Sequence, residues 1–241
     1  MGQFFGSPNQ GYNDSVVPAA QADVLEQRKF ITKVFGWMTV GLAVSAIVGL
    51  LLDRNPQAVM AIGRNWILVA ILQIGLAMGL GLAINRISAA LATLLFLAFS
   101  ASFGLTLSVV MLIFTRQSIY ATFFVTAGTF GSMAAFGYVT KRDLTSVGHM
   151  AGMALWGIVI AMVVNMFMGS AQFQYLISIL GVVVFVALTA YDTQKIKYMY
   201  MVGADGSEVH QKAAIMGALQ LYLDFINLFM FMLQFMGQRR D

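Results

Sequence analysis

Long stretches without a charged side chain constrain this chain more than any other feature of its sequence. Nineteen uncharged residues separate Lys33 from Asp53, and 48 separate Asp143 from Asp192. Three further gaps hold 21, 29 and 24 residues, and residues 213–238 carry a single charge. A helix that crosses a bilayer needs about 20 mostly apolar residues. Each gap is therefore long enough for one span, and the longest is long enough for two.

The longest gap divides at residues 169–172, whose sequence GSAQ is small and polar and is typical of a turn. We therefore predict an all-α integral membrane protein with seven transmembrane helices. The predicted spans lie near residues 34–52, 66–85, 88–113, 119–139, 150–168, 174–194 and 214–236.

The composition excludes several classes of protein. Apolar residues make up 59% of the chain and charged residues only 10%, with a mean hydropathy of +0.80, whereas about a quarter of the residues of a soluble protein are charged. A cytosolic enzyme, a disordered chain and a nucleic-acid-binding protein are excluded. The sequence has no cysteine and no recognisable catalytic or phosphate-binding motif. We therefore expect no enzymatic activity and no cofactor.

The basic residues predict how the chain lies in the membrane. Residues 1–27 are polar and lack the apolar core of a signal peptide, so we expect a mobile N-terminal tail before a seven-helix domain at 28–241. Seven spans place nine of the 14 basic residues on the side of the N-terminus, which the positive-inside rule assigns to the cytoplasm. These nine are Arg28, Lys29, Lys33, Arg86, Lys141, Arg142, Lys195, Lys197 and Lys212.

Two acidic residues lie inside predicted spans. A carboxylate at the centre of a membrane helix costs roughly 2.5–3.5 kcal/mol, so such a residue is usually paired or functional. Asp192 lies near the cytoplasmic end of the sixth span, and Asp224 lies about 15 Å into the seventh at 1.5 Å per residue. Asp224 shares one face of its helix with other small or polar residues, namely Gly217, Gln220, Asn227, Gln234 and Gln238. This face is expected to point into the bundle or toward water, and we therefore predict that the seventh span is the centre of the bundle.

The residues themselves leave the role of these acids open. They could be structural carboxyls that hold helices together, or a titratable, ion-coordinating pair. If they lie close together, both cannot ionise easily. Arg86 ends the second span on the same side of the membrane as Asp192. It could be an ordinary interfacial anchor or the counter-charge of Asp192.

Two segments resemble the transmembrane BAX inhibitor motif family, also called the Bax inhibitor-one family. They are residues 190–197 (AYDTQKIK) and residues 221–229 (LYLDFINLF), and residues 141–144 (KRDL) are similar to its bacterial branch. The resemblance implies six helices around a central seventh and a pH-sensitive calcium leak. It also implies that Asp192 and Asp224 form the pH sensor and that Arg86 latches Asp192 in a closed state. Some relatives carry an acidic residue in the second helix, where this chain reads LQIG at residues 72–75.

Three functional hypotheses follow. The first is a pH-gated leak for Ca²⁺ in a bacterial inner membrane. Ca²⁺ prefers oxygen ligands, and Asp192 and Asp224 would meet the ion, with Gln220 and Asn227 along its path. The second is a proton-coupled carrier that uses the same acids as a relay. The third is a non-transporting regulator that binds another membrane protein, such as a membrane protease.

Overall fold

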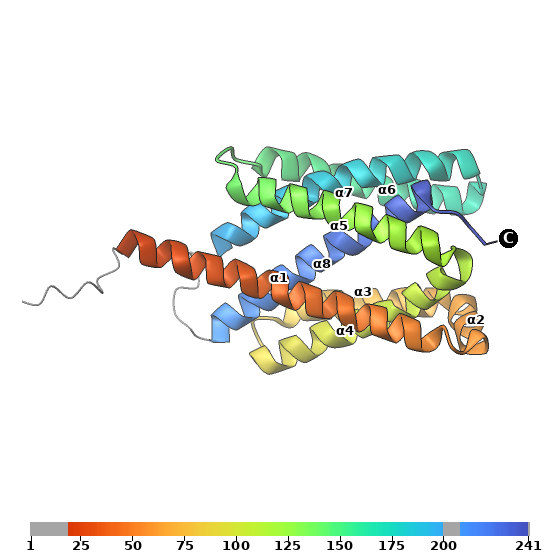
Figure 1. Cartoon of the computed structure of the whole chain (residues 1–241), viewed down its shortest axis with the longest axis horizontal. Helices are drawn as coiled ribbons and strands as arrows, with labels where there is room; N and C mark the ends of the chain where they lie inside the picture. The colour runs from red at the N-terminus through yellow and green to blue at the C-terminus, as the bar shows by residue number, and fades with distance from the viewer. Residues whose placement is uncertain (1–18, 200–207, 241) are drawn as a thin grey trace, which may run out of the picture.

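The structure is a computed structural model that describes residues 19–199 and 208–240, with side chains from residue 24 onward in that part of the chain. It contains eight helices in the described residues (Figure 1). They are α1 (Ala19–Leu52), α2 (Pro56–Arg64), α3 (Trp66–Ala83), α4 (Ala89–Ile113), α5 (Arg116–Val139), α6 (Thr145–Met168), α7 (Ala171–Met199) and α8 (Glu208–Met236).

Seven of these helices are long and apolar enough to cross a membrane, which confirms the predicted fold class. The remaining helix, α2, has only nine residues and was not predicted, because it is too short to span a bilayer. Its start is fixed locally, since the side chain of Asn55 accepts a hydrogen bond from the backbone N–H of Ala58 and Pro56 occupies the first turn.

The N-terminal boundary differs from the expectation. Helix α1 begins at Ala19, so residues 19–27, which the sequence assigned to the tail, are helical. Residues 1–18 lie outside the described part of the chain.

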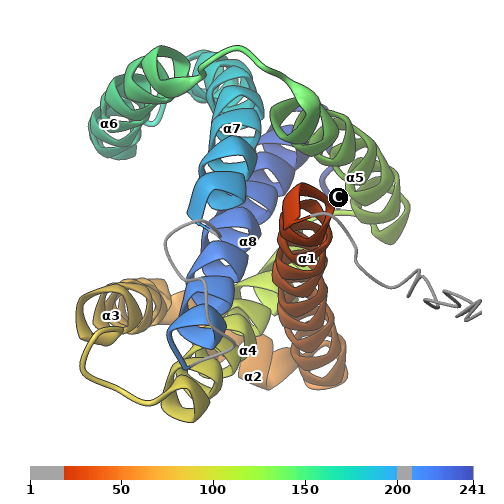
Figure 2. The ribbon, with the colours of Figure 1, turned by 90° about the vertical axis from the view of Figure 1, so that its left-hand side faces the viewer.

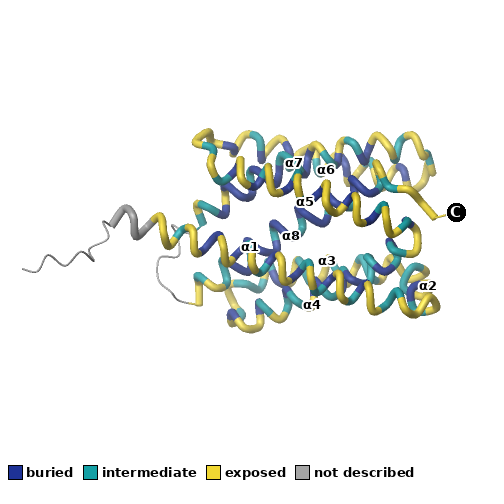
Figure 3. The backbone as a smooth tube through the Cα atoms, viewed as in Figure 1, coloured by how far each residue is buried: buried dark blue, intermediate teal, exposed yellow. Residues whose placement is uncertain are grey.

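Helix α8 lies at the centre of the bundle. Within its most apolar stretch, 72% of the residues are buried, against 6% in α3 and 11% in α6. It packs against α1, α4, α5 and α7, while α3 packs on α4 and α6 packs on α7 as outer helices (Figure 2). Figure 3 shows the same gradient, with buried residues concentrated along α8 and exposed residues on the outer faces. The outer faces carry large apolar side chains, as expected where a helix meets lipid.

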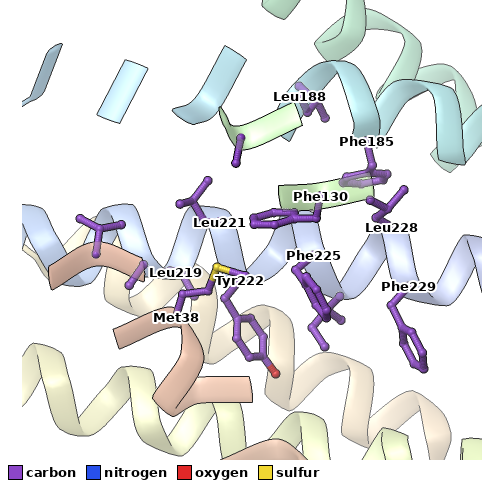
Figure 4. Close-up of a cluster of buried hydrophobic side chains, with 14 of the residues drawn as sticks. Met38, Phe130, Phe185, Leu188, Leu219, Leu221, Tyr222, Phe225, Leu228 and Phe229 are labelled. Atoms are coloured by element: carbon purple, nitrogen blue, oxygen red, sulfur yellow. The ribbon is translucent and has the colours of Figure 1, made fainter. Parts of the chain in front are cut away.

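Aromatic and aliphatic side chains of α8 form the core. Phe225 meets Phe130 of α5 edge to face, with 5.4 Å between the ring centroids, and Leu228 lies near Phe185 of α7 (Figure 4). Helix α7 approaches α5 closely because Gly137 has no side chain. A Cβ at that position would collide with the backbone of Ala190.

Polar contacts fasten one end of the bundle. At the end that carries α2, the guanidinium of Arg116 pairs with Asp53 at 2.7 Å, and the backbone N–H of Thr115 donates to the carbonyl of Gln238. Gln238 therefore lies beyond the end of α8 and is not part of its polar face. The other end carries the first turns of α1 and α8 and the connections α3–α4 and α5–α6 (Figure 1).

Candidate functional site

Helices α7 and α8 bring Asp192 and Asp224 together. Both side chains are buried, with 5% and 4% of their surface exposed. The two carboxyl groups lie close enough to interact, and the side chain of Gln220 lies beside Asp192. Asp224 is 12 residues, or about 18 Å, from the end of α8. The three residues form a small acidic cluster, Asp192, Gln220 and Asp224, in the interior of the bundle.

The charges around this acidic cluster are few. Lys195, an exposed residue one turn further along α7, is the cation that acts on both carboxyl groups. One carboxyl oxygen of Asp224, Oδ2, is buried and has no hydrogen-bond partner among the described residues. A buried acceptor without a partner is costly. This oxygen is therefore available to a proton, a water molecule or a cation.

Arg86 does not contact the acidic cluster in this structure. It is exposed in the connection between α3 and α4, and it forms no ion pair with any part of the chain that the structure describes. The predicted latch between Arg86 and Asp192 is thus not formed here. It stays a prediction for another state of the protein.

The least enclosed face of α8 carries the other predicted path residues. Gln220, Leu223, Asn227, Met230 and Gln234 recur every three or four residues and are half-buried, whereas most of the residues between them are buried. The side-chain amide of Asn227 donates to the carbonyl of Leu223 in its own helix. The predicted polar face of α8 is therefore a strip that is only partly covered by neighbouring helices.

A second polar cluster, which the sequence did not predict, lies toward the opposite end of α8. Gln174 of α7 donates to Gln234 Oε1 at 2.6 Å, and Ser178 donates to the same oxygen at 3.3 Å. Asn165 of α6 donates to Gln174 Oε1 at 2.9 Å. We call Asn165, Gln174, Ser178 and Gln234 the amide cluster. It joins the two outer helices of this side to α8.

An aromatic pair separates the acidic cluster from the amide cluster. The rings of Phe185 and Phe231 stack with centroids 5.7 Å apart and an interplanar angle of 27°. Phe231 lies against Gly181, where a Cβ would be 2.5 Å from the ring. Along the boundary between α7 and α8, the acidic cluster is thus followed by an aromatic pair and then by the amide cluster. Gln220 and Gln234, which belong to the two polar clusters, are about 21 Å apart along α8.

The oxygen atoms in this boundary are suited to a hard cation in transit. Ca²⁺ in a stable site takes six to eight oxygen ligands. The described residues contain no group of three or more His, Cys, Asp or Glu side chains that could hold a metal ion. A pair of carboxyl groups with nearby amides offers fewer oxygen ligands than a stable Ca²⁺ site takes.

Taken together, these features define a multi-pass helical membrane protein with an acidic pair buried beside its central helix. The comparison with known families agrees. The family model described as inhibitor of apoptosis-promoting Bax1 matches residues 27–241, and the chain belongs to this Bax inhibitor family.

Several bacterial proteins are similar over nearly their whole length. An uncharacterized protein of Borreliella burgdorferi is 45% identical over 91% of this chain and 96% of its own. Inner membrane protein YbhL of Escherichia coli is 44% identical over 88% of this chain and 92% of its own. An uncharacterized protein of Deinococcus radiodurans is 38% identical over 93% of this chain and 97% of its own.

Proposed function

We propose that this protein is a pH-sensitive cation leak, with Ca²⁺ as the transported ion, in a bacterial inner membrane. The observation that carries the proposal is the contact between Asp192 and Asp224 in the interior of a membrane bundle. Two carboxyl groups in such a place are costly for structure alone. The name of the relative YbhL supports the inner membrane as the location. The proposed activity is transport, without catalysis.

The pair can sense pH because its members interact. Close, poorly solvated carboxyl groups titrate as a unit and not as two isolated aspartates. In the proposed closed state, the ionised Asp192 attracts Arg86. Protonation removes this attraction, so a fall in pH releases the latch and raises the leak. Lys195 is the other cation that acts on the pair.

The ion would follow the α7–α8 boundary. Asp224 lies deeper than Asp192 and carries an oxygen without a described partner. Asn227 and the amide cluster offer further oxygen atoms toward the opposite end. The stacked pair of Phe185 and Phe231 lies between them and is the proposed barrier in the resting protein.

Ca²⁺ flux in liposomes that contain the purified protein tests the proposal between about pH 5 and 8, the range in which a physiological pH switch operates. We expect Asp192→Asn to leak strongly and to lose most of its pH dependence, because its attraction to Arg86 is gone. We expect Asp224→Asn to depress flux, because it removes the formal negative charge deepest in the path. Asp143→Asn is the matched control. It makes the same substitution in the exposed α5–α6 connection and should keep the pH curve of the parent.

The same assay distinguishes the alternatives. Saturable counterflow of a solute would indicate a proton-coupled carrier. Absence of flux in the parent would favour a regulator that binds another membrane protein, such as a protease. Parent-like pH curves in both aspartate variants would contradict a sensor role for the pair.

A further inference from the structure

Two hollows lie between α1 and α5. The inner hollow, near the start of α1, has a volume of about 480 Å³. The outer hollow has a volume of about 320 Å³ and is lined almost entirely by apolar side chains, with Phe225, Ile226 and Phe229 of α8 among them. The outer hollow therefore lies over the central helix, whereas the inner hollow is lined by α1 and α5 alone.

The inner hollow combines small, apolar and basic residues. The α5 side presents Gly131, Ala134 and Ala135, whose small side chains leave space in the wall. The α1 side presents Ile31 and Phe35. The floor and walls of this hollow can therefore accept an extended hydrocarbon chain.

Its rim carries cations. Arg28 lines the hollow, is exposed, and takes part in no ion pair with the described residues. Tyr138 lies opposite on α5. The ammonium group of Lys197 donates to the Tyr138 carbonyl at 2.9 Å and lies 5.2 Å from the centre of its ring. A second cation, Lys197, thus contacts Tyr138 in the wall opposite Arg28.

We propose that the hollow between α1 and α5 binds one anionic phospholipid, with its phosphate at Arg28 and an acyl chain along α1 toward the outer hollow. A guanidinium is suited to a phosphate because it can donate two parallel hydrogen bonds. Basic residues at a membrane surface attract anionic lipids. The lining of the hollow is mainly apolar and Arg28 supplies a positive charge at its rim, and this combination fits a lipid with an anionic headgroup.

The dimensions agree with this occupant. Arg28 and Leu42, the first residue of α1 to line the outer hollow, are 14 residues or about 21 Å apart along the helix. Half of the hydrocarbon core of a bilayer is about 15 Å thick. An acyl chain that starts at Arg28 therefore extends through its own leaflet before it reaches the outer hollow.

Quenching of tryptophan fluorescence by brominated lipids tests the proposal in the full chain. The three natural tryptophans, Trp37, Trp66 and Trp156, are replaced by phenylalanine, and Phe35→Trp places one reporter in the wall of the hollow. The protein is reconstituted in phosphatidylcholine vesicles that contain either brominated phosphatidylglycerol or the same amount of brominated phosphatidylcholine. A second protein keeps only Trp156, which is 72% exposed on α6, and reports on ordinary boundary lipid.

From the quenching of the Phe35→Trp reporter, we expect the site to bind brominated phosphatidylglycerol with an apparent affinity about fivefold higher than that for brominated phosphatidylcholine. This factor corresponds to the attraction of an anionic lipid by one basic residue near a membrane surface. Arg28→Gln should bring this preference close to one, and Arg28→Lys should retain most of it. Lys29→Gln is the matched control, because Lys29 pairs with Glu26 and does not line the hollow. Trp156 should show no preference.

Equal quenching by the two lipids at the Phe35→Trp reporter would overturn the proposal. So would an equal preference at Trp156, since that would indicate a general effect of surface charge. A preference that survives Arg28→Gln would also overturn it. Circular dichroism of each variant checks that the bundle is intact, and Arg28 is exposed enough for its replacement to leave packing unchanged.

Discussion

At the scale of single residues, Arg86 decides whether the acidic cluster can act as a gate. In this structure Arg86 is exposed and Asp192 is buried. If the two pair in a closed state, their interaction in a partly dry site is stronger than that of a surface pair. We predict that Arg86→Ala raises the basal Ca²⁺ leak several-fold at neutral pH and above, where the proposed latch is closed. Flux from dye-loaded liposomes measures this effect.

The control for Arg86 is Arg64→Ala. Arg64 is an exposed arginine at the opposite end of the bundle, in the last turn of α2. It should leave the leak at the parent level. If Arg86→Ala does the same, Arg86 is an interfacial anchor and the latch is wrong.

The residues of the site differ in how well a sequence reveals them. Asp192 and Asp224 were recognisable because a charge inside an apolar span is rare and costly. Gln174 was not, because single amides occur in many spans as ordinary interhelical bonds. Phe185 and Phe231 are two of 19 phenylalanines. Only their packing across Gly181 shows that they separate the two polar clusters.

At the scale of helices, the end of α7 fastens the connection between α5 and α6. Gln194 is buried, accepts a hydrogen bond from the backbone N–H of Leu144 at 2.9 Å, and donates to the carbonyl of Arg142 at 2.8 Å. It lies two residues after Asp192. In the same connection, hydrogen bonds from the hydroxyl and the backbone N–H of Thr145 hold the pKa of Asp143 below its usual value.

We predict that Gln194→Ala loosens this connection. The substitution leaves the buried N–H of Leu144 without an acceptor, which costs about 1–3 kcal/mol. Amide hydrogen exchange at residues 140–148 should accelerate accordingly, because local opening becomes easier. Gln172→Ala, an exposed glutamine at the other end of α7, should leave that exchange unchanged. Parent-like exchange in Gln194→Ala would show that the backbone holds the connection by other means.

The predicted helices agree with the structure where the membrane sets their length, and they differ where it does not. Charge-free gaps located seven spans, since charges are excluded from hydrocarbon. Helices α7 and α8 continue beyond the predicted limits to Met199 and back to Glu208. The residues in these extensions are helical and include polar side chains, but they lie outside the apolar region. A prediction from hydropathy therefore does not include them.

At the scale of the whole molecule, the basic residues divide between the two ends of the bundle. Arg54, in the connection between α1 and α2, and Arg116, the first residue of α5, lie at the end that carries α2. Arg86 and Lys141 lie in connections at the end that carries the start of α1 (Figure 1). This division agrees with an odd number of spans. It does not give the direction in the cell, and from the positive-inside rule we predict that the first turns of α1 and α8 lie in the cytoplasm.

Single cysteines test this orientation directly, because the natural sequence has none. Arg54→Cys and Lys141→Cys are suitable positions, since both residues are exposed and lie at opposite ends. A maleimide that cannot cross membranes should label Arg54→Cys in intact cells, and should label Lys141→Cys only after the inner membrane is permeabilised. The parent should stay unlabelled throughout. The reverse pattern would invert the bundle, and Arg28 and Arg86 would then face the outside. The pH change that opens the leak would in that case be an external one, and the lipid at Arg28 would belong to the outer leaflet.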